Sequence, residues 1–330
     1  MHTTCIRRVV RAALLITIAS LASCSQGSSA PQVRPSTDTS APAGDAAGAI
    51  NETLANEAGE ERIVYNIGPI DLPAGTEAQP AAPLMLNVQL DRPMWVVGFE
   101  PKIVNAEGAE LDGQLLHSAI VANLREENPL CTSSNVGNPF FVATSTLTSV
   151  HFPRGYGYPL LQSDPIEVKA VMRNPTENDQ VNVYFQLTLV ARPMNEFVNI
   201  KDVKPMLIDV DTCTHKPIAV EPDKITRTQA TYTLAAPYRL IVAHGAIQNY
   251  GISVDLTSNK DVLPFWTAEA VVDDGNKLID LRNDPFENPA GLPLKRGDSL
   301  TLGVVYDNSS DKWVNDATAA AMTYLAPQEE

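Results

Sequence analysis

The stretch from residue 181 to residue 189 alternates apolar and polar side chains, and this period constrains the fold more than any other feature of the chain. Its apolar members, all expected to face a core, are Val181, Val183, Phe185, Leu187 and Leu189. Ser299–Tyr306 alternates in the same way through Leu300, Leu302 and Val304. A period of two is that of a β-strand with one buried face, so these segments predict sheets rather than helices.

Shorter runs of the same character predict further strands. They are Leu84–Leu90, Met94–Phe99, Leu115–Leu124, Ile166–Met172, Tyr238–Ala243, Ile252–Leu256 and Glu269–Val272. Turn clusters such as Asp273–Asn276 and Arg296–Asp298 separate the runs. The chain also has 25 prolines and 18 glycines, which favour frequent turns. We therefore predict an all-β protein made of two tandem jelly-roll-like antiparallel β-sandwiches.

The N-terminal segment is typical of a secretory signal. Arg7, Arg8 and Arg11 precede a short apolar run, which is too short to span a membrane. The sequence Leu21-Ala-Ser-Cys24 then resembles the lipobox of bacterial lipoproteins. This resemblance implies cleavage before Cys24, a diacylglycerol on its sulfur and an acyl chain on its amine. An ordinary cleaved signal with a chance cysteine is the alternative.

The predicted organisation has four parts. Residues 1–23 form the signal peptide, and residues 24–60 form the acylated cysteine and a flexible linker rich in Ser, Pro, Ala and Gly. Residues 61–198 form the first sandwich and residues 199–330 the second. Two or more acyl chains hold a protein stably on a membrane, so we expect an extracytoplasmic, membrane-anchored lipoprotein on the periplasmic side of a bacterial membrane. Either the inner or the outer membrane fits this pattern.

The net charge argues against one class of partner, and the cysteines indicate how the folded part is cross-linked. The formal net charge is −15, and loss of the three signal arginines makes the mature chain more acidic, which argues against nucleic acid. Beyond Cys24 only Cys131 and Cys213 remain after processing, and two cysteines in an oxidising compartment favour one disulfide. A metal site that uses Cys213 and nearby His215 is the alternative, although these residues supply too few ligands.

A series of short motifs runs through both predicted sandwiches. The series is Gly98–Lys102, Leu115–Val121, Pro153–Pro159, Val171–Thr176, Arg239–Gly251, Gly297–Leu300, Val305–Asn308 and Asn315–Thr318. In this order the motifs resemble the copper type II, ascorbate-dependent monooxygenases that hydroxylate peptidylglycine and dopamine, and their bacterial relatives. The resemblance covers about residues 62–326 and implies two tandem sandwiches, each with one copper.

Most positions that would bind copper by this resemblance hold other residues. The His-His pair of the first sandwich is matched by His117-Ser118, and its third histidine by Arg173. The Gly-His-x-His motif of the second sandwich is matched by Gly245-Ala246-Ile247-Gln248, and its methionine by Thr318. Serine, alanine and threonine cannot replace imidazole and thioether ligands, and Arg173 adds a permanent positive charge.

The histidine count supports the same interpretation. The mature chain has four histidines, namely His117, His151, His215 and His244, whereas two such sites need five histidines and a methionine. We therefore expect no cofactor other than the lipid and no catalytic residue. His117 and His244 are the residual metal candidates.

The sequence therefore favours a non-catalytic, lipid-anchored accessory or scaffold subunit of a membrane protein complex. A respiratory, a photosynthetic and a secretion complex fit equally well. A monooxygenase-like enzyme with one residual metal, or a lipoprotein that binds a small molecule or glycan in the vacated cleft between the sandwiches, are the alternatives.

Overall fold

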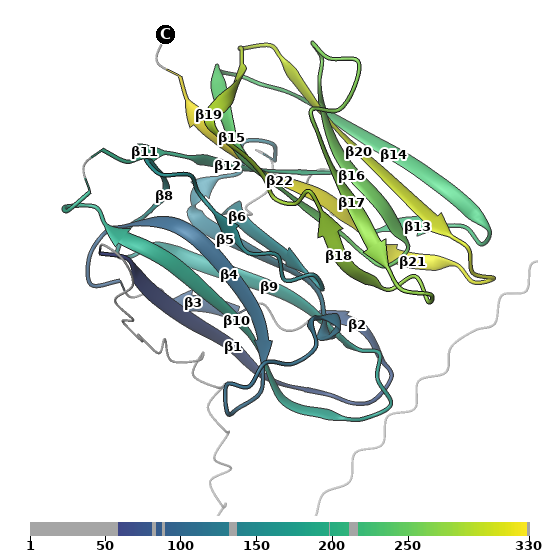
Figure 1. Cartoon of the computed structure of the whole chain (residues 1–330). Coiled ribbons are helices and arrows are strands. Elements are labelled where there is room, and N and C mark those ends of the chain that lie inside the picture. Colours follow the sequence, from purple (N-terminus) through teal and green to yellow (C-terminus); the bar gives the residue numbers. More distant parts are fainter. Residues whose placement is uncertain are drawn as a thin grey trace, which may run out of the picture. The chain divides into compact units, whose positions relative to one another are not determined.

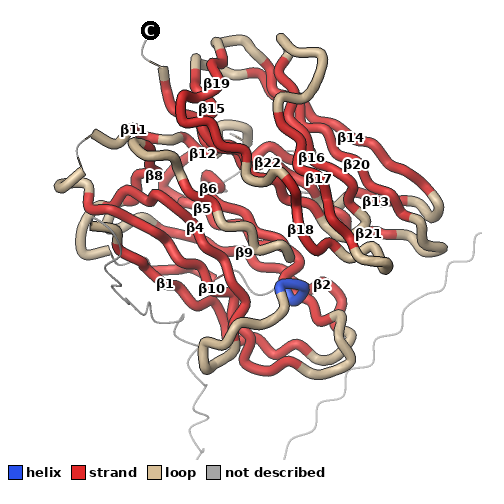
Figure 2. The backbone as a smooth tube through the Cα atoms, in the orientation of Figure 1, coloured by secondary structure: helices blue, strands red, loops and turns tan. Residues whose placement is uncertain are grey.

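The structure is a computed structural model, and it describes residues 59–80, 84–87, 90–131, 137–197, 199–210 and 217–328. The signal peptide, Cys24, Cys213, His215 and nearly all of the predicted linker lie outside these residues. Figure 2 shows that strands dominate the described part, where the one helical element is the 3-10 turn η1 (Gly113–Leu115). The predicted all-β class is confirmed. Within this part no helix is long and apolar enough to cross a membrane.

The first sandwich has two sheets (Figure 1). One sheet contains β1 (Glu61–Leu72), β10 (Gln180–Pro193), β4 (Met94–Val104), β8 (Tyr156–Leu160) and β11 (Lys201–Asp202) in that order, with β7 (Val150–His151) paired to β4. The other contains β9 (Pro165–Asn174), β5 (Leu116–Glu127) and β6 (Gly137–Thr144), with β2 (Thr76–Pro80) and β3 (Leu84–Asn87) both paired to β9. All pairs are antiparallel except that of β11 with β8, which is parallel. Because β11 belongs to this sheet, the first sandwich extends past residue 198.

The second sandwich also has two main sheets. Its inner sheet runs β12 (Lys204–Asp209), β22 (Ala319–Pro327), β15 (Tyr238–Ile247) and β19 (Phe286–Leu294). Its outer sheet runs β14 (Lys224–Thr233), β20 (Ser299–Asn308), β16 (Gly251–Ser258), β17 (Trp266–Val272) and β18 (Leu278–Arg282). A two-stranded ribbon, β13 (Ile218–Val220) with β21 (Val314–Ala317), completes it.

The predicted alternation is present in both long strands, with one exception. Val183, Phe185, Leu187 and Leu189 of β10 are buried, but Val181 is 63% exposed, so its predicted inward orientation is wrong. Asn182 has a φ of 51° and the pairing of β10 with β1 shifts at this point. A left-handed residue at such an irregularity breaks the pleat, and Val181 therefore points to solvent.

The inner sheet of the second sandwich is buried on both faces. Leu240 and Leu325 belong to the core of the second sandwich, whereas Ile241 and Tyr324, from the same two strands, belong to the core of the first. We call the contact between the first sandwich and this sheet the seam. The hydrophobic core of the first sandwich therefore continues across the seam.

Each sandwich contains a turn that a buried asparagine side chain holds in the same way. Asn174, the last residue of β9, donates to the carbonyls of Leu72 and Asn178, each at 2.8 Å. Asn308, the last residue of β20, donates in the same way to Val220 at 3.1 Å and Lys312 at 2.7 Å. Each asparagine Oδ1 also accepts from the residue two positions on, and both asparagines are fully buried. A buried amide with this pattern fixes the turn to a preceding segment.

Replacing Asn308 by alanine is expected to lower the free energy of unfolding by about 1–3 kcal/mol, because two backbone carbonyls lose a buried donor. Denaturant unfolding followed by circular dichroism measures this loss. Asn288→Ala is the matched control, because the Asn288 side chain accepts one exposed hydrogen bond from Ala290 N. Equal destabilisation by the two variants would contradict the structural role of Asn308.

Candidate functional site

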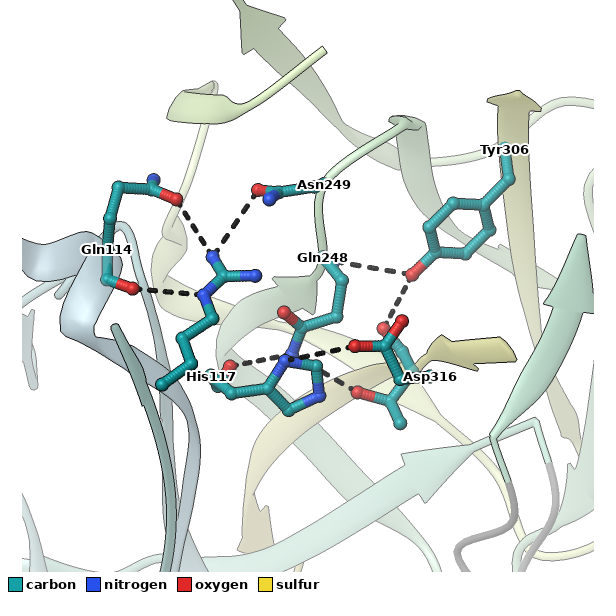
Figure 3. A network of polar contacts seen from close by, with 8 residues as sticks. Gln114, His117, Gln248, Asn249, Tyr306 and Asp316 are labelled. Carbon is teal, nitrogen blue, oxygen red and sulfur yellow. Dashed lines mark hydrogen bonds and ion pairs between the residues drawn. The ribbon is translucent and has the colours of Figure 1, made fainter. Parts of the chain in front are cut away.

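A cluster of polar side chains lies at the seam, and Figure 3 shows it. Its members come from both sandwiches and are linked by hydrogen bonds and one longer ionic contact. We call it the polar cluster; it comprises Gln114, His117, Arg173, Gln248, Asn249, Tyr306, Asp316 and Thr318. Four of these, His117, Arg173, Gln248 and Thr318, are positions that the resemblance assigns to two separate copper sites. The structure brings them together in one cluster.

Arg173 of β9 ties the first sandwich to the second. Its Nε donates to Gln114 O at 2.9 Å and its Nη2 to Gln114 Oε1 at 2.8 Å. The same Nη2 donates to Asn249 Oδ1, in the turn after β15, at 3.5 Å. Burial lowers the pKa of Arg173 and the charges of Asp316 and Asp112 oppose this, but guanidinium stays charged at any physiological pH. Arg173 therefore places a positive charge at the seam.

Gln248 makes the most direct link between the two sets of positions. Its Nε2 donates to the backbone carbonyl of His117 at 2.7 Å and to Thr318 Oγ1 at 3.2 Å. Tyr306 supports it from the outer sheet: Gln248 N donates to the Tyr306 hydroxyl at 3.3 Å, and that hydroxyl donates to Thr318 O at 2.6 Å. A direct hydrogen bond thus joins the positions that the resemblance matches to the first copper site to those that it matches to the second.

His117 of β5 is buried, which favours its neutral form. Burial is the largest cause that lowers its pKa, the Arg173 charge adds to it, and Asp316 opposes both. Its Nδ1 lies 3.9 Å from Asp316 Oδ2 and has no hydrogen-bond partner among the described residues. Ser118, next in β5, is half-buried between Thr144 and Val171 of the neighbouring strands.

The charge of Arg173 can be tested through this histidine. Replacing Arg173 by glutamine removes a positive charge beside His117, so the pKa of His117 is expected to rise toward its ordinary value. NMR titration of the His117 ring protons measures the pKa. Arg154→Gln, at an exposed arginine in the β7–β8 loop, is the control. An unchanged His117 pKa in Arg173→Gln would show that the two groups do not interact.

His244 of β15 is a second buried polar group at the seam. Its Nδ1 lies 3.0 Å from Asp284 Oδ2 and its Nε2 lies 3.0 Å from Val142 O, in the first sandwich. Both ring nitrogens face oxygen acceptors, which favours hydrogen on both and therefore the cationic form of the ring. Burial lowers the pKa of His244, but the Asp284 charge and the two hydrogen bonds outweigh burial and raise it.

This arrangement leaves no lone pair on His244 for a metal. Asp284 Oδ1 also accepts from Gly245 N at 2.8 Å, which fixes the carboxylate. Ala246 packs in the core of the first sandwich, two residues beyond His244. No group of three His, Cys, Asp or Glu side chains in the described ranges is arranged to hold a metal ion.

The remaining predicted residues lie away from the polar cluster. Cys131 is buried and disulfide-bonded, and its predicted partner Cys213 lies outside the described residues, so that pairing stays a prediction. His151 is exposed, with Nε2 3.3 Å from Glu100 Oε1. Sequence reasoning missed Gln114, Asn249 and Asp284 as partners, because no local pattern marks which distant polar side chain a buried group will contact.

A cavity of about 720 Å³ lies at one end of the seam. Lys102, Glu110 and Ser145 of the first sandwich and Asp273 and Lys277 of the second are among its lining residues. Gln114 also lines it and donates to Leu278 O at 2.5 Å, which joins the two sandwiches at this point. The lining is largely polar, and the volume falls in the range of small-molecule sites.

Comparison with known proteins gives no family. No protein-family model matches the chain, and no curated protein matches it. A solved structure of PNGF-II is 8% identical with a TM-score of 0.36, and the match covers 82% of this chain and 60% of PNGF-II. The chain thus spans less than two thirds of PNGF-II.

Two viral proteins are similar at the same low level. The STIV MCP is 10% identical with a TM-score of 0.31, over 81% of this chain and 97% of that protein. PBCV-1 VP54, as fitted into a reconstruction of the virophage Sputnik, is 10% identical with a TM-score of 0.25, over 83% and 95%. Similarities this distant describe neither a site nor an activity, and copper monooxygenases are not among these three proteins.

Proposed function

We propose that this chain is a non-catalytic, lipid-anchored extracytoplasmic accessory or scaffold subunit of a membrane protein complex. The observation that carries the proposal is the 2.7 Å hydrogen bond from Gln248 to the His117 carbonyl, with Arg173 beside it. The resemblance implies two coppers at these positions. The groups found there hold the two sandwiches together. The Arg173 charge opposes binding of a second cation at the same place.

The shared core also supports a scaffold. Because the hydrophobic core of the first sandwich continues into the inner sheet of the second, we expect the two sandwiches to move as one block. An interface that is large and apolar does not allow the domain motions expected of a small polar one. A rigid block on a long tether suits a subunit that presents surfaces to a partner.

Metal analysis of the purified full chain after copper loading and dialysis tests the absence of a catalytic metal. We expect much less than one copper per chain, unchanged by His117→Ala. One tightly held copper that His117→Ala removes would refute the proposal in favour of an enzyme with a residual metal site. Arg173→His is a useful second variant, because it removes the cation and supplies an imidazole at the matching position.

The scaffold role and the anchor need separate measurements. Gentle detergent extraction followed by native electrophoresis is expected to recover the chain in a larger complex, and a chain that always migrates alone would count against the role. Mass spectrometry of the N-terminal peptide is expected to find the acyl chains on Cys24. An unmodified Cys24 would remove the anchor.

The cavity at the end of the seam favours a second candidate function, which is binding of a small polar ligand such as a sugar. Its carboxylates, hydroxyls and lysines suit a ligand with many hydroxyl groups. Thermal unfolding with glucose, galactose and N-acetylglucosamine at millimolar concentration tests this function. A stabilisation that Ile279→Trp abolishes at the cavity rim would support it, and no shift with any sugar would contradict sugar binding.

A further inference from the structure

The loop between β16 and β17 presents two bare aliphatic side chains at its tip. Val262 is 98% exposed and Leu263 is 75% exposed. The other described large apolar side chains that reach solvent, such as Ile225 at 54%, are less exposed. The loop lies at the upper end of the second sandwich in Figure 1.

The tip is held in place from both sides. Asp261 N donates to Ser258 O at 2.9 Å, and Phe265 N donates to Leu256 O at 3.1 Å. The Phe265 ring then packs edge-on against Phe286, at 5.8 Å between centroids. With both flanks fixed and Pro264 beside the tip, Val262 and Leu263 stay in the solvent. Contiguous exposed apolar surface is a mark of interaction sites, and Val262 and Leu263 are adjacent in the chain.

Charged side chains of both signs surround the base of the tip, where the exposed Asp261 lies directly beside Val262. Lys260 pairs with Asp298, in the loop between β19 and β20. Lys295 and Arg296 are exposed in the same loop. The opposite end of this sandwich carries more acidic than basic residues: Glu221, Asp223, Asp273, Asp274, Asp307 and Asp311 against Lys224, Lys277 and Lys312. In an acidic chain, the apolar tip therefore lies at the end where basic side chains slightly outnumber acidic ones.

We propose that this tip inserts into the anionic phospholipid surface to which the chain is tethered. The inference rests on the anchor of the proposed function. Two side chains at a hairpin tip bury far less area than a stable protein interface needs. A tethered tip needs little intrinsic affinity, because the linker keeps it at a high effective concentration near the membrane. The acidic opposite end would be repelled, which orients the sandwich.

The test uses the full lipidated chain in phosphatidylethanolamine–phosphatidylglycerol vesicles with brominated acyl chains. Leu263→Trp places a fluorescent reporter at the tip, and Ile225→Trp places one at the acidic end, against the shared background of three native tryptophans. We expect brominated lipid to quench the Leu263→Trp signal by about twofold and to leave the Ile225→Trp signal unchanged, since an inserted residue reaches the acyl boundary. Equal quenching of the two reporters would overturn the inference.

A second pair of variants tests the role of charge. Lys295→Glu with Arg296→Glu is expected to weaken tip insertion into anionic vesicles by about fivefold per charge, with little change in phosphatidylcholine vesicles. If Cys24 proves unmodified, the proposed anchor fails, and the reporters are then read with vesicles in excess. Quenching under that condition keeps the inference. If the Leu263→Trp reporter stays unquenched with vesicles in excess, or if only a membrane protein shields it, the inference is overturned.

Discussion

Replacing Asp284 by alanine is expected to lower the free energy of unfolding by about 3–5 kcal/mol. The variant leaves the His244 cation buried without its carboxylate, and it removes the acceptor of Gly245 N. Denaturant unfolding at about pH 6 measures the loss, below the ordinary histidine pKa of about 6.5. Asp274→Ala, at an exposed turn position, is the control and should change stability by less than about 0.5 kcal/mol.

The same pair predicts how stability depends on pH. The folded-state pKa of His244 is raised, so its stabilising effect is complete below the unfolded value of about 6.5 and is lost as the pH rises through the folded value. The free energy of unfolding should therefore fall from about pH 6.5 towards alkaline pH. In His244→Gln this fall should flatten. Parallel pH profiles for wild type and variant would contradict a charged His244.

Replacing Phe99 by alanine is expected to cost about 3–5 kcal/mol, the range for large aromatic truncations in a packed core. The Phe99 ring stacks on Phe141 at 4.9 Å between centroids and on Tyr324, from the second sandwich, at 6.1 Å. The Tyr324 hydroxyl in turn donates to Phe140 O at 2.9 Å. The space left by the missing Phe99 ring would therefore open where the two sandwiches pack against each other.

Calorimetry distinguishes a shared core from two independent ones. We expect a single thermal transition for wild type and, at lower temperature, a single transition for Phe99→Ala, because both sandwiches lose packing at once. Ile225→Ala, at an exposed position, should leave the transition nearly unchanged. Two separate transitions, of which Phe99→Ala shifts only one, would show that the seam does not couple the sandwiches.

The strands that the sequence predicts best are those with one buried face. β20 alternates at every position and its inward residues are the predicted ones. β22, with the sequence Ala-Ala-Ala-Met-Thr-Tyr-Leu-Ala-Pro, is buried at almost every position and shows no period of two. β14 was missed for a different reason, since its inward residues are mostly threonine and alanine. A strand gives no alternating pattern in the sequence when both of its faces are buried, and only a weak one when its inner face is barely apolar.

The candidate site was predictable only in part. Reasoning from motifs selected His117, Arg173, Gln248 and Thr318, which the structure brings together. It could not show that they form one cluster, because that depends on how the inner sheet packs against the first sandwich. It also placed His244 among metal candidates, since the sequence gives no sign that Asp284, forty residues later, neutralises its charge.

The doubly buried inner sheet has a consequence for biosynthesis. Its strand β22 lies between β12 and β15 and comes last in sequence among the described strands. Until synthesis delivers it, the apolar surface that Tyr324 and Met322 cover in the first sandwich stays open. The newly made polypeptide therefore passes through an interval in which its earlier part exposes apolar surface. A chaperone that binds exposed apolar segments would have its greatest effect during that interval.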